Sequence, residues 1–129
     1  MDYRNGVRQV SVFNMGGEKV IYLSGAITGK DREDYLSEFS YYEEKLSREW
    51  NTFDTDTGIM EDVKVINPAK VCDQLPKLEQ RQYMHFCMEL LALCDTIYLL
   101  PGWENSEGAK QELSCALAMK MRVEVAPVE

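Results

Sequence analysis

The feature that most constrains the fold is a pair of nearly continuous apolar runs that are rich in β-branched residues. The first is KVIYLSGAI (19–27), the second is DTIYLLPG (95–102), and both end in small residues or a turn signal. A strand with one solvated face would alternate between apolar and polar residues, so each run predicts a strand buried on both faces. Such strands occur almost only in parallel sheets that helices cover on both sides.

Segments with helical spacing separate the predicted strands. Apolar residues recur at intervals of three and four over residues 31–50, and similar spacing predicts helices over 78–94 and 107–120. Two shorter runs, VKVINP (63–68) and RVEVAPV (122–128), predict the other strands. This alternation predicts an α/β fold, a flavodoxin- or Rossmann-like three-layer sandwich around a mainly parallel sheet of four or five strands.

The pattern also predicts the domain organisation. A chain of 129 residues suits one domain. Because the alternation begins at residue 19, we expect that domain to span residues 19–129. Residues 1–18 have little periodicity apart from VRQVSVF, which predicts at most a short strand, so we expect an N-terminal extension there. The segment NTFDTDTGIMED (51–62) is polar and rich in turn residues.

The helix predicted over 78–94 carries more apolar residues than one face needs. Its inner face is expected to hold Leu78, Phe86, Leu90 and Leu93. Beyond that face lie Met84, Cys87, Met88 and Leu91. This surplus favours a homo-oligomer, a dimer or larger, although a wider contact within the chain explains it equally well.

Charge and hydropathy limit the classes of partner. The net charge of -8 argues against a binder of nucleic-acid polymers, because their affinity depends on Lys and Arg. A small nucleotide held by backbone N–H groups remains compatible with this charge. No apolar run approaches the ~20 residues of a membrane span, and the start of the chain lacks a signal-peptide pattern. We therefore expect a cytoplasmic protein with no membrane partner.

The four cysteines and the single histidine do not form a metal-binding pattern. Cys72, Cys87, Cys94 and Cys115 include no CxxC pair, and His85 stands alone on an apolar helix. We expect free thiols in a reducing compartment, and neither a metal site nor a cofactor.

Two loops rich in small residues follow the two most apolar strands. Ligands of open parallel sheets bind beyond the carboxyl ends of the strands, where the strand order reverses, so SGAITG (24–29) and PGWENSEGA (101–109) are expected to meet at one crevice. Any strand-to-helix turn uses such residues, so SGAITG by itself is a weak signal. The residues expected to contact a substrate are Ser24, Gly25, Ile27, Gly102, Trp103, Ser106, Gly108 and Ala109.

Ser106 lies at the start of the helix predicted over 107–120. Its hydroxyl can cap that helix, and the free N–H groups of the first turn favour an anion such as phosphate. Simple capping by Asn105 or Ser106 explains the same residues, and it is the stronger interpretation of this fragment by itself. Trp103 either stacks on a base or covers the core.

Glu112 has a position that solvation does not explain. On a helical wheel it lies roughly 80° from the centre of the apolar arc and in line with Gly108. A solvent-facing glutamate would fall opposite the arc, where Lys110 is. Glu112 is therefore expected to face the crevice. A core role is the default for Tyr22, and for Asp95 a turn role and a functional role are equally supported.

Taken together, these residues resemble the nucleoside 2-deoxyribosyltransferase-like superfamily. The resemblance rests on IYLSGAITG, VINPA and CDTIYLLPGWENSEGAKQELSCA, and it covers roughly residues 19–125. The combination LPGW..S.GA..E...A also resembles a small family of unknown function that is common in bacteriophages and bacteria. The resemblance implies an N-glycosidase or deoxyribosyltransferase that acts on nucleosides or nucleotides.

The resemblance also implies roles for three residues. In that superfamily the glutamate of a G-x-x-x-E-x-x-x-A helix is the nucleophile, and Gly108, Glu112 and Ala116 match this motif. Glu112 would then form a covalent glycosyl intermediate. Tyr22 would orient Glu112, and Asp95 would shuttle a proton or contact the base or sugar.

One position departs from the deoxyribosyltransferases proper. Those enzymes have an aspartate six residues before the glutamate, where it meets the 5′-hydroxyl of a nucleoside, and this chain has Ser106. Serine at this position resembles the related nucleotide N-glycosidases, which accept a 5′-monophosphate. A carboxylate would repel a phosphate, whereas a serine at a helix N-terminus can donate a hydrogen bond to it.

A binding module of the same fold, which recognises a nucleotide without turnover, is the alternative function. The presence of Tyr22, Asp95 and Glu112 favours catalysis, because binding does not need a nucleophile beside the ribose. A scaffold that only shares the fold is a third possibility.

Overall fold

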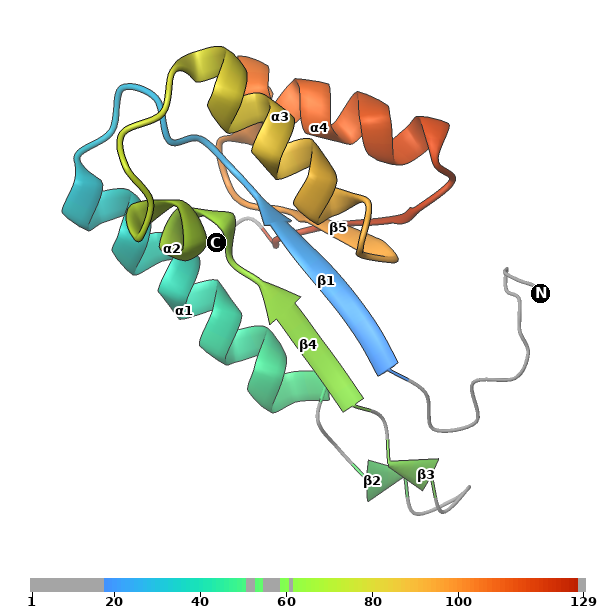
Figure 1. Cartoon of the computed structure of the whole chain (residues 1–129). Coiled ribbons are helices and arrows are strands. Elements are labelled where there is room, and N and C mark those ends of the chain that lie inside the picture. The colour runs from blue at the N-terminus through green and yellow to red at the C-terminus, as the bar shows by residue number, and fades with distance from the viewer. Residues whose placement is uncertain (1–17, 51–52, 55–58, 61, 128–129) are drawn as a thin grey trace.

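Four parallel strands form the sheet at the centre of the molecule (Figure 1). The computed structural model describes residues 18–50, 53–54, 59–60 and 62–127. The strands of this sheet are β1 (Glu18–Ser24), β4 (Asp62–Ile66), β5 (Thr96–Leu99) and β6 (Arg122–Val125). They lie in the order β4-β1-β5-β6, and each neighbouring pair is parallel. The predicted α/β fold is confirmed, with a sheet of four strands.

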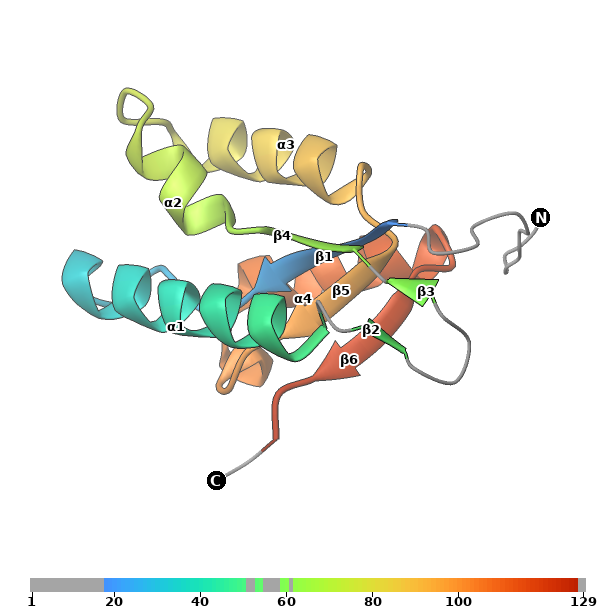
Figure 2. The same cartoon turned by 90° about the horizontal axis from the view of Figure 1, so that it is seen from below.

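Helices cover both faces of the sheet and make the structure a three-layer sandwich (Figure 2). The helix α1 (Arg32–Trp50) lies on one face, and α3 (Gln80–Leu91) and α4 (Glu107–Ala118) pack together on the other. These are the three helices that the apolar spacing predicts. The topology places the loop after β1 and the start of α4 at the same end of the sheet.

The side chains of β1 alternate between the two layers. Ile21 and Leu23 pack in the core on the α1 side, and Tyr22 packs in the core formed with α3 and α4. All three side chains are fully buried. Because successive residues of a strand point to opposite faces, Tyr22 and Ser24 share the face toward α3 and α4. This alternation decides which layer of the molecule receives the polar groups of β1.

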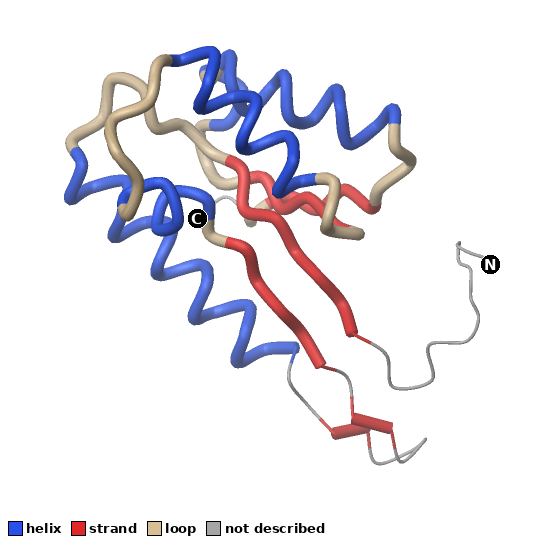
Figure 3. The backbone as a smooth tube through the Cα atoms, in the orientation of Figure 1, coloured by secondary structure: helices blue, strands red, loops and turns tan. Residues whose placement is uncertain are grey.

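The order of the strands reverses between β1 and β5. Ser24 pairs with Leu99, so the two strands end at the same level of the sheet. The helix that follows β1 lies on one face and the helix that follows β5 lies on the other, which opens a crevice between the two loops. Figure 3 shows the loops that follow β1 and β4 at this carboxyl edge of the sheet.

The strands are shorter than the apolar runs that predict them. The strand predicted over 63–68 ends at Ile66, because Asn67 begins a short helix, α2 (Pro68–Asp73), that the sequence pattern does not predict. The Asn67 side chain accepts a hydrogen bond from the N–H of Lys70, and Pro68 occupies the first helical position, where its missing N–H is not needed. The ends of the other apolar runs belong to the loops at the carboxyl edge.

The inner face of α3 differs from the prediction. Cys87 and Leu91, expected beyond that face, are fully buried, whereas Leu93, expected on it, is 71% exposed. Met88 packs against the same core. The apolar surplus of this helix is therefore used within the chain. A homo-oligomer stays a prediction, without that surplus as its support.

Other expectations concern segments with few described residues. The predicted extension over 1–18 lies outside the described residues up to residue 17, and residue 18 begins β1. Within the polar segment 51–62, β2 (Phe53–Asp54) and β3 (Ile59–Met60) form an antiparallel pair. In the described part of the chain no helix is long and apolar enough to cross a membrane, and no group of His, Cys, Asp and Glu side chains could hold a metal ion. All four cysteines are free, as expected.

Candidate active site

Glu112 lies in the second turn of α4 with its carboxylate bound to two hydroxyl groups of β1. The Tyr22 hydroxyl donates to Oε2 over 2.6 Å, and the Ser24 hydroxyl donates to Oε1 over 2.7 Å. Glu112 is only 6% exposed. The alternation of β1 places both hydroxyls on the face toward α4, so the strand and the helix fix both oxygens of the carboxylate.

Two opposing effects act on the ionisation of Glu112. Burial raises the pKa of Glu112, because removal from water disfavours the charged form. The hydrogen bonds from Tyr22 and Ser24 act to lower this pKa, because both are donated to the carboxylate. Burial, together with the nearby Glu112, raises the pKa of Tyr22 well above its ordinary value. Tyr22 is therefore a protonated donor at neutral pH.

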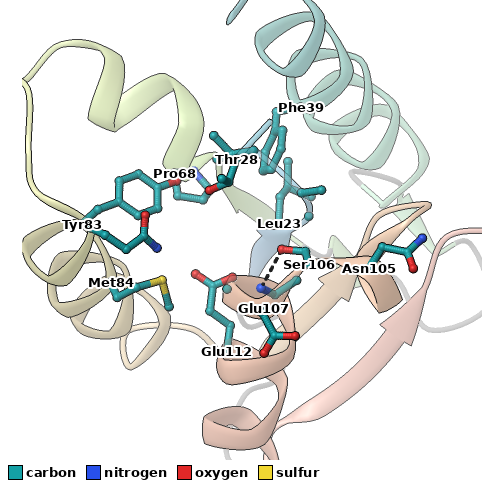
Figure 4. Close-up of a pocket in the computed structure, with 16 residues that line it drawn as sticks. Leu23, Thr28, Phe39, Pro68, Tyr83, Met84, Asn105, Ser106, Glu107 and Glu112 are labelled. Atoms are coloured by element: carbon teal, nitrogen blue, oxygen red, sulfur yellow. Dashed lines mark hydrogen bonds between the residues drawn. The ribbon is translucent and has the colours of Figure 1, made fainter. Parts of the chain in front are cut away.

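A cavity of about 450 Å³ adjoins Glu112 at the carboxyl ends of β1 and β5. Its walls come from the loop after β1, the start of α4, and the face of α3 that carries Tyr83 and Met84. In Figure 4 the Glu112 carboxylate lies between two groups of side chains. Tyr83 and Met84 lie to one side of it, and Ser106 lies to the other. A cavity of this size is within the range of small-molecule sites.

The first turn of α4 forms one end of the cavity. Ser106 is the N-cap, and its Oγ accepts a hydrogen bond from the N–H of Ala109 over 3.1 Å. The N–H groups of Glu107 and Gly108 have no hydrogen-bond partner among the described residues. The Glu107 side chain is exposed and pairs with Lys110 over 3.0 Å. Two backbone donors at a helix N-terminus thus line the cavity.

Two positions in the cavity wall are occupied by glycine for different structural reasons. A Cβ at Gly25 would lie 3.0 Å from the Cβ of Leu100, so any other residue would force the loop after β1 and the residue after β5 apart by a few tenths of an ångström. A Cβ at Gly108 would lie 3.5 Å from the Met84 sulfur, which is an ordinary contact. Gly108 therefore keeps space in the cavity rather than relieving a clash.

Most of the predicted site residues lie together. Glu112 and its donors Tyr22 and Ser24 form the hydrogen-bonded group. The predicted residues in the wall of the cavity are Gly25, Ile27, Ser106, Gly108 and Ala109.

Asp95 lies at the opposite end of the sheet from Glu112. It precedes β5, and its carboxylate accepts hydrogen bonds from the Val20 N–H over 3.0 Å and from the Thr96 hydroxyl over 2.8 Å. Leu99, at the carboxyl end of β5, lies four positions further along the chain than Asp95, which corresponds to roughly 13 Å at the usual rise per residue. The structure therefore does not bring Asp95 together with Glu112, and its carboxylate links β1 at Val20 to the start of β5 at Thr96.

Trp103 and Gly102 also lie outside the cavity wall. Trp103 is half-buried in the short helix η1 (Trp103–Asn105) and packs against the core beneath α3 and α4. It therefore covers the core, which was one of its two predicted roles, and does not line the cavity. Gly102 has φ +86°, a conformation that other residues rarely adopt, so its role is in the turn.

Sequence reasoning missed the wall that α3 and α2 supply. Tyr83, Met84, Gln80 and Pro68 all line the cavity. The sequence contains a signal for the first of these, because Tyr83, Cys87 and Leu91 recur at intervals of four. The prediction places Cys87 and Leu91 beyond the inner face of the helix and does not include Tyr83, so Tyr83 is absent from the predicted site.

The comparisons with known proteins concern the same part of the chain as the fold. A search of curated proteins gives no match. The family described as "Domain of unknown function (DUF4406)" matches residues 19–125, a range that contains all the site residues above. This match spans most of the 129 residues, so the chain belongs to the DUF4406 family.

Proposed function

We propose that the protein cleaves the N-glycosidic bond of a nucleoside 5′-monophosphate through a covalent glycosyl intermediate on Glu112. The observation that carries this proposal is the setting of Glu112, a nearly buried carboxylate that Tyr22 and Ser24 hold at both oxygens beside a cavity. Among the described residues no cation pairs with Glu112, so no ion pair offsets the free energy of burying this charge. A carboxylate kept in such a setting is typical of a functional site.

The chemistry needs a carboxylate of fixed orientation. Glu112 forms a bond to C1′ as the C1′–N bond breaks, through a transition state that resembles an oxocarbenium ion. The base leaves with the bonding electrons and takes up a proton. Water then attacks C1′ and gives up a proton to solvent, the bond to Glu112 breaks, and the carboxylate is restored. Asp95 lies far from Glu112, so it does not protonate the leaving base. The base takes its proton from solvent in the open cavity.

The first turn of α4 is the end of the cavity that suits a phosphate. The N–H groups of Glu107 and Gly108 and the helix dipole favour an anion there. Ser106 adds a hydroxyl without adding a negative charge. No lysine, arginine or histidine lines this cavity among the described residues, so backbone groups would provide the attraction.

The resemblance to the nucleoside 2-deoxyribosyltransferase-like superfamily supports the same roles. The motif that places the nucleophile on Glu112 lies on α4, and the tyrosine expected to orient it donates a hydrogen bond to it. Transfer of the sugar to a second base is the same chemistry with a different acceptor, because a base replaces water in the second step.

The test is base release from a panel of nucleosides and nucleoside 5′-monophosphates. Glu112→Gln removes the nucleophile and keeps the side chain's shape, so we expect kcat to fall by at least about 10⁴-fold. Glu104→Gln is the matched control, because Glu104 is an exposed carboxylate just before α4 that does not line the cavity. Mass spectrometry after rapid quenching should detect a sugar phosphate on the peptide that contains Glu112.

The outcomes separate the candidate functions. Cleavage that depends on Glu112 supports the enzyme. Binding of a nucleotide to the wild type without cleavage would instead identify a binding module. Equal turnover by wild type and Glu112→Gln would disprove the role of Glu112.

A further inference from the structure

A second cavity of about 440 Å³ lies next to the first. This cavity is open to solvent, and its walls come mostly from the start of α1, from α2 and from the loop that leads from α2 to α3. Ile27 and Tyr83 line both cavities, so these two side chains form a shared wall. Nothing in the mechanism above uses this space, although it is as large as the cavity beside Glu112.

The direction of a bound nucleotide follows from the positions around Glu112. C1′ must lie at the carboxylate, and the phosphate end lies at the first turn of α4. Figure 4 shows Ser106 on one side of Glu112 and Tyr83 on the other. Because the base and the 5′-phosphate leave the sugar in different directions, a phosphate near Ser106 directs the base toward Tyr83. The base then lies at the wall that the two cavities share.

The walls of the second cavity suit an apolar group. Most of its lining side chains are aliphatic or aromatic, among them Tyr35, Leu75 and Leu78. Three charged residues line it: Arg32 and Asp73 form an ion pair, in which Arg32 Nε and Nη2 donate to the Asp73 carboxylate over 2.7 and 2.5 Å, and Lys77 is exposed. Because seven of its eleven lining side chains are aliphatic or aromatic, the cavity favours an apolar group, and Lys77 adds one positive charge to its wall.

We infer that the base of the substrate carries an apolar substituent, which passes between Ile27 and Tyr83 into the second cavity. This inference rests on the proposed function, because Glu112 and α4 set the direction of the nucleotide. It names the substrate class more narrowly: a nucleoside 5′-monophosphate whose base bears an apolar group. An unmodified nucleotide would leave the second cavity unfilled.

The test compares matched nucleotides and a variant that fills the second cavity. The substrates are AMP, N6-benzyl-AMP, UMP and 5-phenyl-UMP, each also as the 2′-deoxynucleotide. In the wild type we expect the larger member of at least one pair to have a kcat/KM about tenfold higher or more. Leu75→Trp places a large ring in the second cavity, so this ratio should fall to near one. Leu93→Trp is the control, because Leu93 is exposed and lines neither cavity, and it should keep the wild-type ratio.

A second variant guards against loss of folding. Leu78→Phe fills the same cavity from another position, and circular dichroism and thermal melting show whether each variant is folded. Cleavage of the unmodified nucleotides with no preference for the larger ones would overturn the inference and leave the proposed function intact. A preference for a nucleotide whose base carries an anionic substituent would also overturn it. Absence of cleavage of every nucleotide would contradict the proposed function itself.

Discussion

The carboxylate of Glu112 is subject to two opposing influences at the scale of one residue. Burial disfavours its charge, whereas hydrogen bonds from Tyr22 and Ser24 favour it, and burial has the larger effect on the pKa. A nucleophile needs the charged form, and weak solvation makes that form more reactive. The same burial therefore serves the proposed reaction and opposes the stability of the fold.

The stability of the folded chain should depend on pH because Glu112 ionises in a buried position. Because the folded state raises the pKa of Glu112 above the ordinary value of 4.5, the folded chain holds this proton more tightly than the unfolded chain. Ionised Glu112 therefore lowers stability at neutral pH, and the effect vanishes as the pH falls below 4.5. We expect Glu112→Gln to melt at a higher temperature than the wild type at pH 7, with a smaller difference at pH 4. A difference that does not change with pH would contradict this account.

Ser106 permits a test of the phosphate end with little structural change. Aspartate and asparagine cap helices about as well as serine, so Ser106→Asp and Ser106→Asn should both keep α4 folded. Only aspartate adds a charge that repels a phosphate. We expect Ser106→Asp to lower kcat/KM for a nucleoside 5′-monophosphate at least about tenfold relative to the nucleoside, and Ser106→Asn to have a much smaller effect. Steady-state kinetics on AMP and adenosine check this, and equal effects of both variants would refute the phosphate site.

The strand β1 organises the site at the scale of secondary structure. Its odd-numbered residues Ile21 and Leu23 pack in the core on the α1 side, and its even-numbered residues Tyr22 and Ser24 reach Glu112. Register with β5 then places the ends of both strands at one level. One apolar strand thereby supplies both the core and the donors of the carboxylate, because alternate side chains point in opposite directions.

Asp95 contacts the same two strands at the end of the sheet that lies away from Glu112. Its carboxylate accepts the N–H of Val20 and the hydroxyl of Thr96 at the starts of β1 and β5. Asp95→Ala removes these bonds, so we expect the free energy of unfolding to fall by about 1–2 kcal/mol. The kcat of base release should stay close to that of the wild type. Chemical denaturation and kinetics test both statements, and a hundredfold loss of kcat with unchanged stability would return Asp95 to the catalytic group.

At the scale of the whole molecule, the cavity joins parts of all three layers. Its walls include the loop after β1, Phe39 of α1, the face of α3 and the start of α4. These segments are far apart in the sequence and meet only at the carboxyl edge of the sheet. A ligand that fills the cavity contacts several elements at once, and it should therefore stabilise the folded state as a whole.

Thermal melting measures how much a bound ligand stabilises the folded state. We expect Glu112→Gln to bind the nucleotide without turnover, so AMP at about 100 times its Kd should stabilise this variant by about 2.7 kcal/mol and raise its Tm by several degrees. Inorganic phosphate at the same concentration is the control, because it has the charge without the sugar and base. A Tm shift that is equal for AMP and phosphate would show that the cavity does not hold the nucleoside.

Particular elements show how far the sequence could predict this molecule. The unbroken apolar runs predicted buried parallel strands, because burial on both faces excludes polar residues. The helical wheel predicted that Glu112 faces the crevice, because its angle is a local property of α4. The bounds of the strands were less predictable, since the runs continue into apolar loops beyond Ser24 and Leu99.

The remaining site residues depended on packing between distant segments. Asp95 precedes β5, and the site lies at the other end of that strand. The local sequence does not show at which end of the strand a ligand binds. Trp103 packs against the core and does not line the cavity, whereas Tyr83, which the predicted faces of the helix do not include, lines it. The sequence by itself determined the alternation of elements and the direction of Glu112, because periodicity records local burial. Only the tertiary structure decided which side chains surround that carboxylate, because this depends on register and on how three layers pack.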